Sequence, residues 1–198
     1  LVTVEVHISN GLPAFSIVGL PETSVKEAKD RVRSALINCG YEFPAKRITV
    51  NLAPADLPKE GARFDLPIAI GILVASDQLP NQELEDYEFV GELALSGEMR
   101  PIIGEIPVAM ACKEQQRKLI LPLANAAKAK WVHDSQLIAI EHLQQLYPHF
   151  ARQSPLPLFS IDIKEKPEPN FELDMSDVIG QPVAKRALEI AASGSHNL

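Results

Sequence analysis

The feature that most constrains the fold is the alternation of strand-like and helix-like segments along roughly the first 150 residues. Residues 1–8 alternate apolar and polar side chains, which is typical of a half-buried strand. Residues 23–38 repeat apolar side chains every three or four positions, which is typical of an amphipathic helix. Further strands are expected at 13–18, 47–52, 118–121 and 137–140, and further helices at 65–77, 104–116, 124–129 and 141–147. This order predicts one α/β (α+β) domain with a mixed sheet covered by helices.

Turn signals between these segments add detail. Asn10-Gly11 separates the first two predicted strands, and this dipeptide favours a tight hairpin, so those strands are expected to pair antiparallel. Thr23 or Ser24 can cap the first helix, and Asp65 can cap the helix at 65–77.

The composition changes after residue 151. Four prolines fall within fifteen residues, which predicts a semi-rigid, extended linker. Beyond it, Pro182 and Gly194 bracket a helix expected at 182–193. We therefore expect a domain at 1–151, a linker at 152–171 and the beginning of a second, truncated domain at 172–198.

Composition narrows the possible functions. The formal charge of -7 argues against a domain that coats nucleic acid by bulk charge, although a local basic face remains possible. Cys39 and Cys112 form no C-x-x-C pair and the five histidines are scattered, so no metal site is expected. Two free thiols fit a reducing cytoplasm. The longest apolar run, 66–75, is about half of the length that spans a membrane.

Two blocks of sequence carry a resemblance to a known fold. They are Lys59-Glu-Gly-Ala-Arg-Phe-Asp-Leu-Pro-Ile-Ala-Ile-Gly-Ile-Leu73 and Phe89-Val-Gly-Glu-Leu-Ala-Leu-Ser-Gly-Glu-Met-Arg-Pro-Ile-Ile-Gly104. In order and spacing they are similar to the Lon-type protease domain. That resemblance implies a Lon-like fold for residues 1–151.

The catalytic residues of that family are missing. A Lon protease needs a serine nucleophile and a lysine that deprotonates it. The serine position falls on Ile68 and the lysine position on Ile106. Neither isoleucine has an ionisable or nucleophilic group, so we expect no catalytic residue here. A serine-directed probe that labelled the protein would reopen this question.

The whole chain resembles the magnesium-chelatase-like AAA+ family of the ComM competence type. The resemblance rests on residues 10–27, on 31–36 and 48–56, on the two Lon-like blocks and on Asp177 to Leu198. It implies a bacterial cytoplasmic protein with a Lon-like domain followed by an AAA+ motor that forms a homohexamer-like ring. It also implies ATP and Mg²⁺ as cofactors of the full-length parent. Its activity would be that of a DNA helicase or branch-migration factor, acting on single-stranded or branched DNA in natural transformation and recombination.

The nucleotide chemistry is only partly within these residues. A phosphate loop requires G-x-x-x-x-G-K-[ST], which does not occur here and is expected just past Leu198. In AAA+ motors the segment matching Val178, Ile179 and Gly180 often lies near adenine, so these residues are candidates for nucleotide binding. The alternative is a helix start that packs on its own domain.

Candidate contacts to DNA phosphates are cations near the first helix and in the loops that follow. Spacings of three and four place Lys26, Lys29 and Arg33 on one helix face. Four more precede or follow the strand at 47–52, namely Lys46, Arg47, Lys59 and Arg63. The alternative interpretation is a solvated surface, because Glu22, Glu27 and Asp30 dilute the positive field.

Two functions therefore remain open. In the first, the chain is the non-proteolytic N-terminal region of an AAA+ DNA helicase and positions DNA or neighbouring subunits. In the second, it is an adaptor that recruits a protein partner to a chaperone- or unfoldase-type AAA+ motor. The fragment alone is expected to catalyse nothing.

Overall fold

The computed structural model describes residues 1–161 and 174–197. The chain divides into two units, Leu1–Ile161 and Asp162–Leu198, and each is described by itself. Residues 162–171 of the expected linker, and 172, 173 and 198 of the expected second domain, lie outside the described residues.

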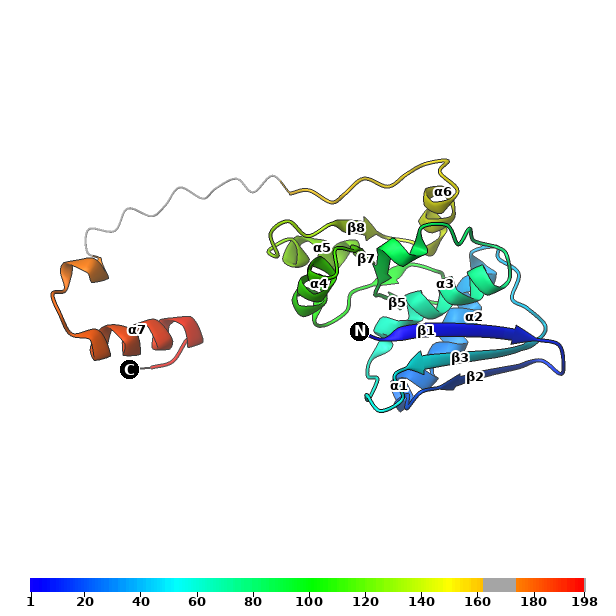
Figure 1. The fold of residues 1–198 in the computed structure, drawn as a ribbon, viewed down its shortest axis with the longest axis horizontal. Coiled ribbons are helices and arrows are strands. Elements are labelled where there is room, and N and C mark those ends of the chain that lie inside the picture. The colour runs from blue at the N-terminus through cyan, green and yellow to red at the C-terminus, as the bar shows by residue number, and fades with distance from the viewer. Residues whose placement is uncertain (162–173, 198) are drawn as a thin grey trace. The chain divides into compact units, whose positions relative to one another are not determined.

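The first sheet has three strands in the order β1-β3-β2 (Figure 1). They are β1 (Thr3–Ser9), β2 (Ala14–Val18) and β3 (Arg47–Ala53). β3 runs antiparallel to β1, with Thr3 opposite Ala53, and parallel to β2, with Ala14 opposite Arg47. β3 is the central strand, and its alternate residues Ile48, Val50 and Leu52 are fully buried.

This strand order corrects the predicted hairpin. β1 and β2 do run in opposite directions, but β3 lies between them, so they form no ladder with each other. The connection at residues 10–13 must therefore span two strand spacings, about 10 Å, which a two-residue hairpin turn cannot do. Asn10-Gly11 marks a turn correctly, but the pairing partner comes from more than thirty residues further on.

Helices of the first half pack on this sheet and on each other. They are α1 (Thr23–Lys26), α2 (Ala28–Asn38) and α3 (Asp65–Ala75), the last preceded by a 3-10 turn, η1 (Ala62–Phe64). α2 buries Ala28, Val32, Ala35 and Leu36, the stripe expected from its period. α3 contacts both β1 and α2, and seven of its residues are buried. It is therefore the central element of the main hydrophobic core.

The second half contains a parallel sheet in the order β4-β7-β8, formed by β4 (Tyr87–Phe89), β7 (Lys118–Pro122) and β8 (Leu137–Ile140). The helices α4 (Glu105–Glu114) and α5 (Leu123–Ala129) lie between these strands in sequence and pack on each other. A short antiparallel pair, β5 (Glu92–Leu93) and β6 (Met99–Arg100), follows β4. The other short elements of this half are the 3-10 turns η2 (Leu84–Asp86) and η3 (Leu143–Gln145) and the short helix α6 (Leu146–Phe150). The predicted mixed α/β class is confirmed.

The second unit contains a 3-10 turn, η4 (Met175–Asp177), and the helix α7 (Pro182–Gly194). α7 begins at the proline predicted to start it and ends at the glycine predicted to end it. No helix among the described residues is long and apolar enough to cross a membrane.

Candidate functional site

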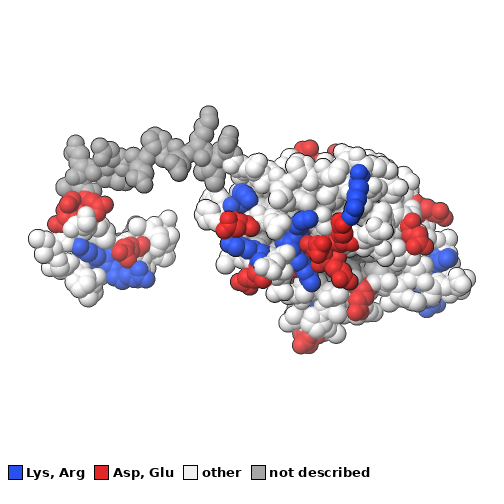
Figure 2. All heavy atoms as spheres, turned by 45° about the horizontal axis from the view of Figure 1, so that its top comes forward, with Lys and Arg blue, Asp and Glu red and all other residues white. Residues whose placement is uncertain are grey.

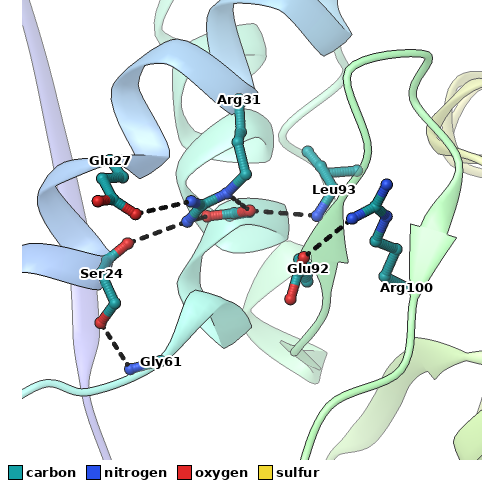
Figure 3. A network of polar contacts seen from close by, with 8 residues as sticks. Ser24, Glu27, Arg31, Gly61, Glu92, Leu93 and Arg100 are labelled. Atoms are coloured by element: carbon teal, nitrogen blue, oxygen red, sulfur yellow. Dashed lines mark hydrogen bonds and ion pairs between the residues drawn. The ribbon is translucent and has the colours of Figure 1, made fainter.

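A buried ion pair occupies the place where the Lon-like blocks meet the first helices (Figure 3). Asp65, the first residue of α3, is fully buried. Arg31 of α2 donates from Nε to Asp65 Oδ2 at 2.7 Å and from Nη2 to Oδ1 at 3.0 Å. The backbone N–H of Leu93 donates to Oδ2 at 3.2 Å. Asp65 therefore joins α2, α3 and β5. The prediction that it caps α3 is wrong, because its side chain forms no capping hydrogen bond to that helix.

Two opposing effects act on this pair. Burial raises the pKa of Asp65, while the hydrogen bonds and charge of Arg31 and the N–H of Leu93 act in the opposite direction. The hydrogen bond to Asp65 raises the pKa of Arg31 further above its already high value. We expect the ionised pair, because two parallel N–H···O bonds satisfy both carboxylate oxygens.

Further hydrogen bonds connect the ion pair to neighbouring elements. Arg31 Nη2 also donates to the carbonyl of Ser24 at 3.0 Å, and Ser24 Oγ accepts from Gly61 N at 3.1 Å. Ser24 therefore ties the loop before α3 to the first helices and does not cap them. In the same part of the fold, Ile68, the residue at which the Lon resemblance predicts a serine position, is fully buried within α3. This arrangement holds elements together and offers no nucleophile.

Lys59 requires a correction. Sequence reasoning placed it among the cations available to DNA phosphates, but it is only 1% exposed. Its ammonium donates to the carbonyl of Pro54, and its own carbonyl accepts from Glu22 N at 3.2 Å. Lys59 thus anchors the loop 54–59 from inside, where a phosphate cannot reach it.

Among the other predicted cations, Arg33 lies over an aromatic pair. The guanidinium of Arg33 lies 5.2 Å from the centre of the Phe43 ring, and Phe43 packs 5.8 Å from Phe15. Phe15 lies opposite Ile48 in the β2–β3 ladder, so the exposed Lys46 and Arg47 immediately precede the same position on β3. We call Arg33, Phe43, Phe15, Lys46 and Arg47 the basic-aromatic corner. Lys46 and Arg47 belong to it by their place at the start of β3, and Arg47 faces the opposite side of the sheet from Phe15 and Ile48.

The remaining cations do not join this corner by any described contact. Lys26 ends α1 and is exposed, and Lys29 lies on α2 and is half-buried. The predicted single helix is divided at Glu27 into α1 and α2. Arg63 is half-buried, and its guanidinium nitrogens lie near Gly104, with 3.8 Å to the position that a Cβ would occupy there. Figure 2 shows acidic and basic side chains interspersed on the visible face of the first unit, without one broad basic field.

The residues proposed to contact adenine lie in the second unit. Val178, Ile179 and Gly180 connect η4 to α7, and all three are exposed, with Ile179 at 95%. At Gly180, nothing lies within 4 Å of the position that a Cβ would occupy. A flat base could therefore approach this segment, but the printed sequence has no phosphate loop to hold the nucleotide beside it.

Two features had no local sequence signal. An open cavity of about 880 Å³ lies between β1, α3 and β4, lined mainly by apolar residues such as Val4, Val74 and Phe89. The Arg31–Asp65 pair joins residues 34 positions apart, and nothing near either residue marks the other. Among the described residues, no group of three or more His, Cys, Asp or Glu side chains could hold a metal ion.

Known proteins resemble the chain along its whole length. Residues 4–125 match the family described as subunit ChlI of Mg-chelatase, and residues 174–198 match magnesium chelatase, subunit ChlI. Competence protein ComM of Haemophilus influenzae is 55% identical over 202 residues, which cover 100% of this chain and 40% of that protein. YifB of Escherichia coli is 50% identical over 203 residues, covering 100% of the chain and 38% of that protein.

A Lon protease is a more distant relative. Lon protease 2 of Bacillus subtilis is 27% identical over 127 residues, which cover 63% of this chain and 22% of that protein. The chain thus spans about two fifths of the length of ComM and YifB and a smaller part of the Lon protease.

Proposed function

The chain belongs to the family of the magnesium-chelatase subunit ChlI, and on that premise we propose that it is the non-proteolytic N-terminal region of a ComM-like AAA+ protein that acts on DNA. Residues 1–151 form the Lon-like domain of this proposal, 152–171 the linker, and 172–198 the beginning of the motor. The parent protein would be a cytoplasmic homohexamer that uses ATP and Mg²⁺ to move along single-stranded or branched DNA during transformation and recombination.

The first unit would position DNA or a neighbouring subunit. The observation that supports this role is the basic-aromatic corner, which combines three exposed cations with two half-buried rings. Cations fix the phosphate backbone, and an arginine held over a ring keeps its charge while losing little freedom on binding. The isoleucines at both dyad positions support a role without peptide hydrolysis.

Nucleotide binding would involve the second unit only at its edge. Val178, Ile179 and Gly180 would offer exposed backbone and apolar side chains to an adenine ring. When bound, ATP with Mg²⁺ would supply the free energy for movement, and residues outside the printed sequence would hold its phosphates.

A salt titration of DNA binding tests the proposal. Affinity for a labelled single-stranded oligonucleotide is measured by fluorescence anisotropy from 20 to 200 mM salt, for the parent chain and for the triple variant Arg33→Ala, Lys46→Ala and Arg47→Ala. Each lost phosphate contact lowers the slope of log affinity against log salt by about 0.7, so the triple variant is expected to lose about 2.

Matched variants separate the corner from general charge. A second triple variant, Lys26→Ala, Lys29→Ala and Arg33→Ala, measures how much the cations predicted on the first helix contribute to the salt dependence. The control variant Lys113→Ala removes a cation that donates to the carbonyl of His133, in the second half of the unit. The last is expected to leave the slope unchanged. Absence of DNA binding at low salt, alone or within the full-length ring, would favour the adaptor function and contradict the proposal.

A further inference from the structure

His149 on α6 contains the only buried side-chain nitrogen or oxygen without a hydrogen-bond partner in the described part of the chain. This atom is Nε2. The other ring nitrogen, Nδ1, accepts a hydrogen bond of 2.9 Å from the backbone N–H of Leu156. A neutral imidazole that accepts at Nδ1 must carry its proton on Nε2. The geometry therefore indicates a neutral ring that is protonated on Nε2.

The surroundings of His149 are mostly aromatic. The Tyr87 ring of β4 lies edge-on at 5.8 Å, and Phe150 lies at 4.9 Å with its plane also steeply inclined. Nε2–H forms no hydrogen bond with these neighbours, the Tyr87 hydroxyl included, and stays unpaired. The site accommodates a neutral histidine and disfavours a second proton.

Charged groups face the ring from the neighbouring elements. Lys118 of β7 has its ammonium 5.0 Å from the centre of the Tyr87 ring. Glu83, just before η2, pairs with Arg152, just beyond α6. Burial lowers the pKa of His149 most, Lys118 lowers it further, and Glu83 opposes them. The net effect keeps the ring neutral at neutral pH.

The bond to Leu156 fastens a segment that we call the strap, residues 154–161. Leu156 packs against the main core, and Phe159 packs against the second cluster. The N–H of Phe159 donates to the carbonyl of Leu137 at 2.7 Å, which fixes the far end of the strap to β8. Within the strap, the His149 bond is the one attachment described here that depends on a titratable side chain.

We propose that His149 is a proton-sensitive latch, and that protonation of Nδ1 releases the Leu156 end of the strap from the first unit. A proton on Nδ1 turns the acceptor into a donor, so two N–H groups then face each other at hydrogen-bond distance. At the same time a charge arises in an apolar cage beside Lys118. Moving the strap away lets both the ring and the Leu156 N–H reach water. The Phe159 attachment involves no titratable group and remains.

The direction of the pH dependence follows from linkage. In the open state the imidazole is free in water and titrates near its ordinary value of about 6.5, while in the closed state its pKa is lower. Closure is therefore fully favoured above about pH 6.5 and weakens as the pH falls below that value. At pH 5.5 the open state gains a factor of up to about 10 over its population at pH 7.5.

Hydrogen exchange at the Leu156 amide measures this population directly. The protection factor, which is the intrinsic rate divided by the observed rate, is determined by NMR at pH 7.5 and 5.5, with Phe159 as an internal reference. We expect protection at Leu156 to fall up to about tenfold at the lower pH, and protection at Phe159 to change much less. Equal protection of Leu156 at both pH values would overturn the latch.

Three variants assign the effect to the ring. His149→Phe keeps an aromatic ring but has no acceptor, so Leu156 should be weakly protected at both pH values. His149→Gln cannot titrate, so its protection at Leu156 should be independent of pH whatever its level. His142→Asn removes another histidine that accepts a backbone N–H, that of Gln144, and should leave the pH dependence at Leu156 intact. If His149→Gln retained the full pH dependence, another group would be responsible and the latch would be wrong.

Discussion

Arg31 and Asp65 meet side by side through two hydrogen bonds of 2.7 and 3.0 Å where α2 packs on α3. The carboxylate is fully buried, and the Arg31 side chain is 21% exposed. Removing one partner leaves the other charged group in a low-dielectric site, and the cost of that is commonly about 3–5 kcal/mol.

We therefore expect Arg31→Ala to lower the free energy of unfolding by about 3–5 kcal/mol, measured by urea denaturation. Arg31→Lys should recover only part of this, because an ammonium cannot form the two parallel bonds. The double variant Arg31→Met, Asp65→Leu tests the cause. Its loss should be clearly smaller than the sum of the two single losses, and additive losses would mean that the pair does not act as a unit.

Lys59 provides a second test, in which stability and DNA binding are expected to separate. Lys59→Met keeps the length of the buried side chain but leaves the carbonyl of Pro54 without its donor. We expect a loss of about 1–3 kcal/mol in unfolding free energy, measured by urea denaturation. The salt dependence of DNA binding should match that of the parent chain, whereas a reduced slope would show that Lys59 reaches phosphate after all.

The contrast between Lys59 and its neighbours shows what sequence could and could not predict. Helix bounds such as those of α3 and α7 follow from apolar period and flanking Pro or Gly, which are local. The position of β3 between β1 and β2 depends on pairing across more than thirty residues, and no local pattern records it. Lys59 lies among Pro58, Glu60 and Gly61, residues that are typical of an exposed loop. Its side chain is nevertheless buried, and its ammonium donates to the carbonyl of Pro54.

The candidate site also has features that the sequence predicts and features that only the structure shows. Arg33 was predicted on a helix face, and the structure places it over Phe43, which packs on Phe15. Sequence reasoning had assigned these two rings no role. The predicted absence of the dyad rests on two positions alone, Ile68 and Ile106, because a catalytic role depends on residue type before it depends on geometry.

Cys112 gives a prediction that depends on pH. Burial, followed by the charge of Glu88, raises the pKa of its thiol from the ordinary 9.0 to about 12, and Arg117 opposes this only in part. Because only the thiolate reacts, we expect alkylation by iodoacetamide at pH 8 to be roughly a thousandfold slower in the folded chain than in urea. Mass spectrometry of the peptide that contains Cys112 measures both rates. Comparable rates would mean that this thiol is not held in its neutral form.

The same shift affects stability at high pH. The unfolded thiol ionises as the pH rises through 9.0, while the folded thiol remains protonated until about 12. The stabilisation is thus complete below pH 9 and is lost between pH 9 and 12. Cys112→Ala should lose less stability than the parent over that interval when unfolding is followed by urea titration at each pH. An identical decline in both proteins would assign it to other groups, such as lysines.

Gly19 tests the close packing of the turn after β2 against β3. Its φ of +96° is unfavourable for any other residue, and a Cβ there would lie 2.2 Å from the carbonyl oxygen of Leu52. Gly40 has a similar φ of +83°, but nothing lies within 4 Å of its Cβ position. The strain of a positive φ costs about 1–3 kcal/mol, so Gly40→Ala should lose about that much stability. Gly19→Ala should lose clearly more, because β2 must also move away from the buried Leu52. Urea denaturation of both variants measures the difference, and equal losses would show that the Gly19 turn has room that the structure does not give it.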